Sequence, residues 1–221
     1  MKSIVIYSGG LDSLTALHWA IRNSEEVKAI SFDYGQKHKK ELEYAKKVTK
    51  ELGIEHKVID VSFLKELLSN SALTSDIDVP EGDYKDDNMK ITVVPNRNAI
   101  FINIAIGWCS NLGYDRVIVG VHSGDHFIYP DCRKEFISAI ETCSILATKG
   151  MGEIRVEAPF IDYQKKNIVK YGNEIGINYT DSWSCYKGGL NHCGKCGTCR
   201  ERIEAFELAN VKDPTIYDSN N

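Results

Sequence analysis

The chain has 221 residues, enough for one large domain with its own hydrophobic core. Its 27 Lys and Arg are outnumbered by 31 Asp and Glu, and this net charge of −4 argues against nucleic acid as a partner. We expect a cytoplasmic protein with no membrane partner, because the N-terminus lacks the features of a signal peptide and no apolar stretch reaches the roughly 18 residues of a membrane span.

Apolar, β-branched segments alternate along the chain with segments whose apolar residues recur at helical spacing. We predict strands at residues 3–7, 27–32, 56–60, 116–121 and 154–157. We predict helices between them, at residues 11–22, 37–52, 98–111, 133–149 and 164–171. This alternation is typical of an α/β fold built on a parallel sheet, here of five strands. The polar, acidic segment at residues 74–90 is interpreted as a surface insertion or a mobile lid.

The first predicted strand is followed at once by the turn SGGLDS and a helix. This order places a helix N-terminus where it can bind a phosphate, although the turn matches neither the Walker A motif nor the dinucleotide-binding motif. Asp12 is unusual there, because a carboxylate repels a phosphate unless a cation such as Mg²⁺ lies between them. We therefore predict a nucleotide site with Mg²⁺ formed by Ser8, Gly9, Gly10, Leu11, Asp12 and Ser13, and the resemblance described below implies that the nucleotide is ATP.

Four of the seven cysteines follow the spacing C-x7-C-x2-C-x2-C near the C-terminus. Four thiolates at such spacing are typical of a closed, tetrahedral, structural zinc site, and we predict one Zn²⁺ held by Cys185, Cys193, Cys196 and Cys199. An iron–sulfur cluster is the alternative, because the C-x2-C-x2-C part also suits one. His192 could replace one sulfur but is interpreted as a bystander.

Two motifs resemble those of the N-type ATP pyrophosphatases, the PP-loop superfamily. SGGLDS resembles their phosphate loop, and APFIDYQKKNIVKYGNEIG, at residues 158–176, resembles their later lysine-containing pattern. The resemblance implies a Rossmann-like sheet of the adenine nucleotide alpha hydrolase-like type. It also implies that Lys165 faces the phosphates, and that a substrate oxygen attacks the α-phosphate of ATP and releases pyrophosphate.

Three further stretches narrow the resemblance, namely VPNRN at 94–98, GVHSGDHFIYPDCR at 120–133, and the cysteine-containing TDSWSCYKGGLNHCGKCGTCRERIEAF at 180–206. In this order they resemble the 7-cyano-7-deazaguanine synthases, over nearly the whole chain. That family's reaction joins 7-carboxy-7-deazaguanine to ammonia, with two ATP, and yields the nitrile preQ0 for queuosine synthesis. The resemblance also implies a homodimer. His192 and residues 126–128 depart from the expected pattern.

The resemblance implies a division of the chain and a role for several residues. We expect a PP-loop domain at 1–180 and a zinc-binding region with a helix at 181–221. The catalytic candidates are Asp12, Lys165, Arg97 and Arg133, where either arginine would hold the substrate carboxylate or the α-phosphate. The candidates for binding the deazapurine are Asp125, Tyr129 and Asp131, with Phe127 as an alternative stacking ring. The competing interpretation of these loop side chains is structural or solvated.

Two other functions remain compatible with the motifs. One is a tRNA-thiolating PP-loop enzyme, which the acidic charge balance and the lack of an added RNA-binding domain disfavour. The other is a non-enzymatic interaction module, in which a zinc-binding region sits on a degenerate nucleotide-binding fold. The intact SGGLDS turn and Lys165 argue against degeneration.

Overall fold

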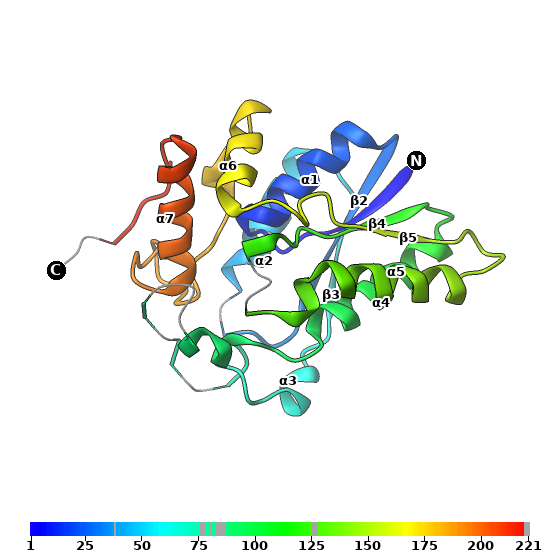
Figure 1. Ribbon diagram of the computed structural model, residues 1–221, viewed down its shortest axis with the longest axis horizontal. Coiled ribbons are helices and arrows are strands. Elements are labelled where there is room, and N and C mark those ends of the chain that lie inside the picture. Colours follow the sequence, from blue (N-terminus) through cyan, green and yellow to red (C-terminus); the bar gives the residue numbers. More distant parts are fainter. Residues whose placement is uncertain (38, 76–77, 80, 83–86, 125–127, 219–221) are drawn as a thin grey trace.

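The computed structural model of the chain has a central sheet covered by helices on both faces (Figure 1). It describes residues 1–37, 39–75, 78–79, 81–82, 87–124 and 128–218. Five parallel strands lie in the order β3-β2-β1-β4-β5, which confirms the predicted α/β fold. Within the described ranges, no helix has the length and apolar character needed to cross a membrane.

The strands lie where β-branched segments predicted them, with small shifts at their ends. They are β1 (Lys2–Ile6), β2 (Glu26–Asp33), β3 (His56–Asp60), β4 (Arg116–Ile118) and β5 (Arg155–Glu157). Strand β4 is shorter than predicted. Beyond it the chain turns toward the loop after β1, where Gly120 packs against the backbone of Asp12. This turn brings two loops together at the carboxyl edge of the sheet.

The helices form two layers, because alternate strand residues point to opposite faces. Val5 packs on one face with α1 (Leu11–Asn23), α2 (Lys40–Glu51), α6 (Lys165–Glu174) and α7 (Gly197–Ala209). Ile4 packs on the other face with α3 (Leu64–Leu67), α4 (Arg97–Asn111) and α5 (Lys134–Ala147). Figure 1 shows α1 and α6 above the strands and α4 and α5 below them.

All five predicted helices are present, with small shifts at their ends. Helix α2 begins at Lys40 rather than at residue 37, and the Lys37 N–H donates to the Leu73 carbonyl oxygen at 3.0 Å instead of joining a helix. The four-residue helix α3 was not predicted. The short 3₁₀ helices η1 (Asp87–Thr92), η3 (Pro130–Cys132) and η4 (Tyr179–Asp181) were not predicted either.

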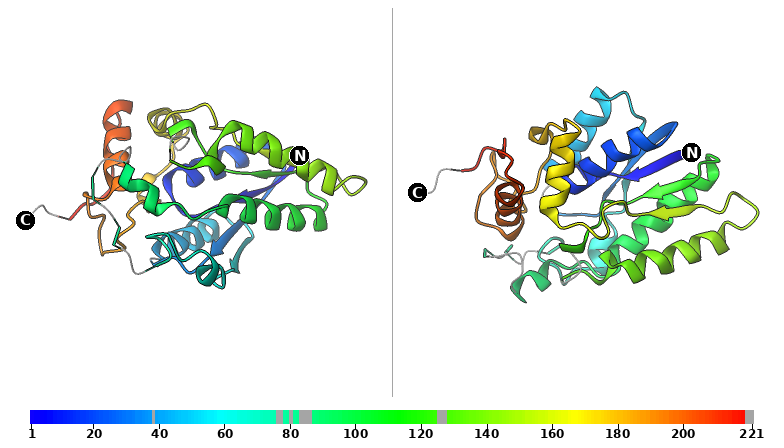
Figure 2. Two further views of the ribbon diagram at one scale, coloured as in Figure 1. Left: turned by 60° about the horizontal axis from the view of Figure 1, so that its bottom comes forward. Right: turned by 45° about the horizontal axis from the view of Figure 1, so that its top comes forward.

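The last helix, α7, stands at the carboxyl edge of the sheet, on the side away from the N-terminus (Figure 2). It packs along α6, and Ala205 and Phe206 belong to the same apolar cluster as Val5 of the central strand. Arg202 is fully buried and donates to Asp213 and to the Ser182 hydroxyl, at 3.2 and 2.8 Å. The C-terminal region therefore shares its core with the sheet domain, and a boundary at 180/181 stays a prediction.

The predicted insertion at 74–90 is described only in part, since residues 76, 77, 80 and 83–86 lie outside the described residues. Glu81 forms an ion pair with Lys187, and the Gly82 N–H donates to the Lys195 carbonyl oxygen at 3.3 Å. Met89, in η1, is buried. The described parts of this segment thus pack against the cysteine-rich region.

Candidate functional site

A cavity of about 260 Å³ opens at the carboxyl ends of β1, β2 and β4, where parallel sheets bind their ligands. One end is formed by the turn after β1 together with the start of α6. The residues there include Ser8, Gly10, Leu11, Asp12, Ser13 and Lys165. The structure thus brings most of the predicted ATP-binding residues and the predicted catalytic lysine into one cavity.

The turn after β1 presents hydrogen-bond donors at the start of α1. The hydroxyls of Ser8 and Ser13 lie 3.0 Å apart, and the Ser8 hydroxyl accepts the Gly10 N–H at 3.2 Å. Helix α1 has no side-chain cap, and the N–H groups of residues 11–13 donate to no other described residue. Free N–H groups at the positive end of a helix are suited to a phosphate.

Two glycines fix the shape of this turn by close backbone packing. Gly9 has φ +94°, and a Cβ on it would lie 2.0 Å from the backbone oxygen of Glu41 in α2. A Cβ on Gly120 would lie 3.1 Å from the backbone of Asp12. Gly9 does not line the cavity, so the absence of a Cβ allows the backbone of α2 to pack against the turn and is not needed for an anion to reach it.

Three charged side chains from three different helices meet beside the turn. The Nζ of Lys165 lies 3.2 Å from the Asp12 carboxylate and 2.5 Å from the carboxylate of Glu201 in α7. His122, fully buried after β4, places its Nε2 3.6 Å from Asp12 and accepts the Gly124 N–H at its Nδ1. The predicted lysine is therefore held between two carboxylates.

Asp12 is poised to remain ionised. Burial by itself would raise the pKa of this carboxyl, but Lys165 and His122 outweigh that effect and hold the pKa well below its usual range. One of its oxygens, Oδ1, is buried without a hydrogen-bond partner among the described residues. An ionised carboxylate with a free oxygen beside phosphate-binding N–H groups fits the Mg²⁺ that accompanies ATP.

The other predicted residues fall into three groups. Arg97 and Tyr129 line the cavity, and the Tyr129 hydroxyl lies 2.7 Å from that of Thr92. Arg133 is exposed and does not line it, while the Asp131 carboxylate accepts the Asn98 N–H at 3.0 Å in the first turn of α4. Asp125 and Phe127 lie outside the described residues.

Several residues of the site were not predicted. His122 lies inside the GVHSGDHFIYPDCR stretch, whose place after a strand was a usable signal. Glu201 lies in an ordinary charged helix pattern, and so does Glu41, which lines the cavity from α2. Glu201 lies within the cysteine-containing stretch at 180–206, but nothing in that stretch or around Glu41 indicates a role, because each glutamate reaches the site only through the packing of its helix.

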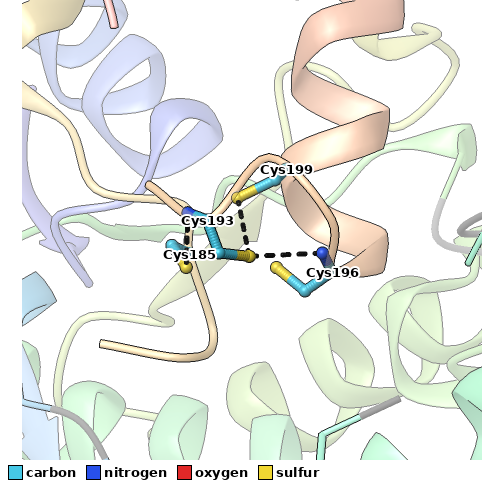
Figure 3. Close-up of side chains that lie close together, drawn as sticks. All are labelled: Cys185, Cys193, Cys196 and Cys199. Atoms are coloured by element: carbon cyan, nitrogen blue, oxygen red, sulfur yellow. Dashed lines mark hydrogen bonds between the residues drawn. The ribbon is translucent and has the colours of Figure 1, made fainter. Parts of the chain in front are cut away.

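The four predicted cysteines converge at the start of α7 (Figure 3). Their sulfur atoms lie within 4.8 Å of one another. The Cys185 sulfur accepts the Lys187 and Cys193 N–H groups, each at 3.4 Å, and the Cys193 sulfur accepts two more, from Lys195 and Cys196. Backbone donors around converging sulfurs stabilise thiolate charge, so these residues fit a tetrahedral metal ion.

His192 is not a member of this sulfur cluster. Its Nε2 accepts the Ser184 N–H at 3.0 Å, and its ring packs against Trp183 with centroids 4.1 Å apart. Among the described residues, the group that could hold a metal consists of the four cysteines. The ring of His192 therefore supports the loop that carries the cysteines.

Comparison with solved structures supports the fold. NMN synthetase from Francisella tularensis is similar over 96% of this chain and 78% of its own, with a TM-score of 0.52 and 14% identity. NH3-dependent NAD synthetase from Campylobacter jejuni subsp. jejuni is similar over 96% and 79%, with a TM-score of 0.50 and 15% identity. At these identities the similarity shows the architecture alone.

Sequence relatives are far closer. A 7-cyano-7-deazaguanine synthase from Marinomonas sp. is 48% identical over 99% of both chains. One from Caldicellulosiruptor bescii is 50% identical over 99% of this chain and 98% of its own. Residues 2–210 match the family described as queuosine biosynthesis protein QueC. This match over nearly the whole length shows that the chain belongs to the QueC family.

Proposed function

We propose that this protein is a 7-cyano-7-deazaguanine synthase, which converts 7-carboxy-7-deazaguanine and ammonia to the nitrile preQ0 at the expense of two ATP. The proposal is supported by family membership and by relatives of that name about half identical over their full length. The observation that carries it is the partly buried Asp12 carboxylate, whose buried oxygen Oδ1 has no partner among the described residues and which lies 3.2 Å from Lys165 at the free N-terminus of α1. This arrangement suits the pyrophosphate end of ATP.

In the first half of the reaction, a carboxylate oxygen of the substrate attacks the α-phosphate and pyrophosphate leaves. Ser8, Ser13 and the N–H groups of α1 bind the leaving pyrophosphate, and Lys165 adds its positive charge. Asp12 would hold the Mg²⁺, which when bound neutralises part of the pyrophosphate charge. Ammonia then attacks the acyl carbon, AMP leaves and an amide forms.

The second half uses the same geometry. The amide oxygen attacks the α-phosphate of a second ATP, pyrophosphate leaves, and loss of AMP with a proton from nitrogen gives the nitrile. Both halves need an oxygen held in line with the α-phosphate. Arg97 lines the cavity and is assigned to the substrate, whereas Arg133 is exposed and is the weaker of the two predicted arginines.

The metal at the cysteine cluster is proposed to be one structural Zn²⁺ per chain. Four sulfurs leave no open position for a water, so the ion contributes to folding rather than to the reaction. The homodimer rests on family resemblance, and the cytoplasmic location and small-molecule partners rest on the sequence features described above. Iron with labile sulfide at this cluster would instead favour the thiolating alternative.

The direct test incubates the protein with 7-carboxy-7-deazaguanine, ATP, Mg²⁺ and ammonium, and follows AMP by chromatography and the nitrile by mass. We expect two AMP for each nitrile. If the acid stays intact while ATP–pyrophosphate exchange responds to a different acid, the assigned substrate is wrong.

Asp12→Asn tests the role of the carboxylate. It removes the negative charge beside Lys165 and replaces one of the two carboxylate oxygens with an amide, which binds a cation poorly, and we expect turnover to fall by about 100-fold or more, with the fold retained. Asp162→Asn is the matched control, because Asp162 is an exposed ion-pair partner of Lys134 outside the cavity. Equal turnover of the two variants would contradict the assignment of Asp12.

A further inference from the structure

Beside the residues of the phosphate-binding turn, the cavity is lined by a second set of side chains with a different chemistry. We call this set the second end of the cavity, and it consists of aromatic side chains, one glutamate and one arginine. The Arg97 guanidinium lies 5.5 Å from the centre of the Tyr34 ring and donates to the Tyr34 hydroxyl at 3.3 Å. Tyr34 packs in turn against Phe101, with ring centroids 5.6 Å apart. Flat rings beside a fixed guanidinium are suited to a planar, polar heterocycle.

Glu41 provides the negative charge of this end. Its backbone is anchored, because its carbonyl oxygen lies against Gly9 of the phosphate-binding turn. Its carboxylate interacts electrostatically with Arg97, Tyr34 and Tyr186, all of which line the cavity. Among the described residues, no hydrogen bond and no ion pair within 4.0 Å engages this carboxylate. Both oxygens of this cavity-lining carboxylate can therefore accept hydrogen bonds from a ligand.

The remaining carboxylates near the cavity are already engaged. The described residues that line it include two acidic ones, Asp12 and Glu41. Asp12 lies against Lys165 at the phosphate end. Asp131, one of the acids predicted to read the substrate, accepts a backbone N–H of α4 instead. Within the described part of the site, Glu41 is therefore the cavity-lining carboxylate that no ion pair or hydrogen bond engages, and it can accept from a ligand that offers N–H donors.

A guanine-like ring offers two adjacent donors, the ring N–H and the 2-amino group, next to a carbonyl oxygen. A carboxylate accepts such a donor pair with both of its oxygens, and a guanidinium donates to the carbonyl oxygen. We propose that Glu41, with Arg97 beside it, is the specificity-determining residue that binds the 2-amino-6-oxo edge of the deazapurine. This inference rests on the proposed function, and it leaves the 7-carboxylate free to face the α-phosphate.

The ionisation of Glu41 supports this role. Burial raises the pKa of its carboxyl to about 7, although the positive charge of Arg97 lowers it. A ligand that donates two N–H groups favours the ionised form, so binding of the deazapurine draws the pKa down. The affinity for the deazapurine should accordingly weaken as the pH falls below 7, because the protonated Glu41 carboxyl can no longer accept both N–H donors.

The test measures binding by calorimetry without turnover. Two ligands are compared, 7-carboxy-7-deazaguanine and its analogue that lacks the 2-amino group, on the wild type, Glu41→Gln and Glu43→Gln. Glu43 is an exposed residue of the same first turn of α2, so its substitution changes the same charge outside the cavity. We expect the wild type and Glu43→Gln to prefer the 2-amino ligand by about 10- to 100-fold, and Glu41→Gln to lose that preference.

ATP affinity of the same variants separates the two ends of the cavity. We expect Glu41→Gln to bind ATP within about twofold of the wild type, since the phosphate-binding groups are unchanged. Retained preference for the 2-amino ligand in Glu41→Gln would overturn the inference, and so would a loss of ATP affinity without a loss of preference. If the wild type shows the binding preference but forms no nitrile, the proposed reaction fails while the binding role of Glu41 stands.

Discussion

Gly9→Ala offers a sharp test of how the phosphate-binding turn is built. An L residue at φ +94° is strained, which costs about 1–2 kcal/mol. The new Cβ would also lie 2.0 Å from the Glu41 carbonyl oxygen, whereas real Cβ contacts stay above 3.0 Å, so the turn and α2 must separate by about 1 Å. Overpacking of this kind costs a further ~1–3 kcal/mol, because a helix backbone cannot rotate away.

Gly176→Ala is the matched control for the conformational part. Gly176 has φ +81°, and no atom lies within 4 Å of a Cβ placed on it. The backbone strain is similar in both variants, so the difference between their free energies of unfolding in urea, compared at equal m-values, gives the cost of the contact with Glu41. We expect Gly9→Ala to be less stable than Gly176→Ala by ~1–3 kcal/mol. It should also lose at least about 100-fold in ATP–pyrophosphate exchange, since phosphate chemistry is sensitive to a 1 Å displacement. Equal stability and full activity would refute the close packing of α2 on the turn.

Two further predictions concern stability. Cys196→Ser, or a strong chelator on the wild type, should remove the bound metal and lower the free energy of unfolding by at least ~3 kcal/mol. The control Cys143→Ser, at an exposed cysteine, should keep its metal content and stability. An unchanged metal content in Cys196→Ser would contradict the four-sulfur site. Burial and the nearby Lys46 lower the pKa of His56 from 6.5 to about 4, so the unfolded chain takes up the proton first and stability falls as pH drops from 6.5 to 4. His56→Gln should flatten that part of the urea-midpoint profile, and an unaltered slope would assign the effect to other groups.

The sheet was predictable because each strand is an apolar, β-branched segment between helical patterns, and local sequence decides both. The strand, turn and helix at residues 2–23 were predictable for the same reason, since they are contiguous, whereas phosphate binding by the turn stays a prediction. The structural role of Gly9 was not predictable, because the Glu41 backbone that it contacts lies more than 30 residues away in the sequence and approaches it only when α2 packs against the turn. Short elements such as α3 lack the length to produce a periodic pattern.

The residues that complete the site were less accessible to sequence reasoning. His122 and Glu201 are separated by most of the second half of the chain, and they meet around Lys165 and Asp12 only in the folded molecule. Asp131 was a substrate-binding candidate from its loop, and only the folded structure shows that its carboxylate accepts a backbone N–H of α4. Which of several polar loop residues faces a ligand depends on such tertiary contacts.

The ion pair between Glu201 and Lys165 has a consequence for the whole molecule. Glu201 lies two residues after Cys199 on the same helix, and its carboxylate is 2.5 Å from the lysine that lies beside Asp12 at the phosphate-binding turn. An ion bound by the cysteines would therefore fix the start of α7, and through Glu201 it would fix the position of the Lys165 charge beside Asp12. We accordingly expect metal content and pyrophosphate affinity to be thermodynamically linked, so that removal of the metal weakens pyrophosphate binding and bound pyrophosphate strengthens metal binding.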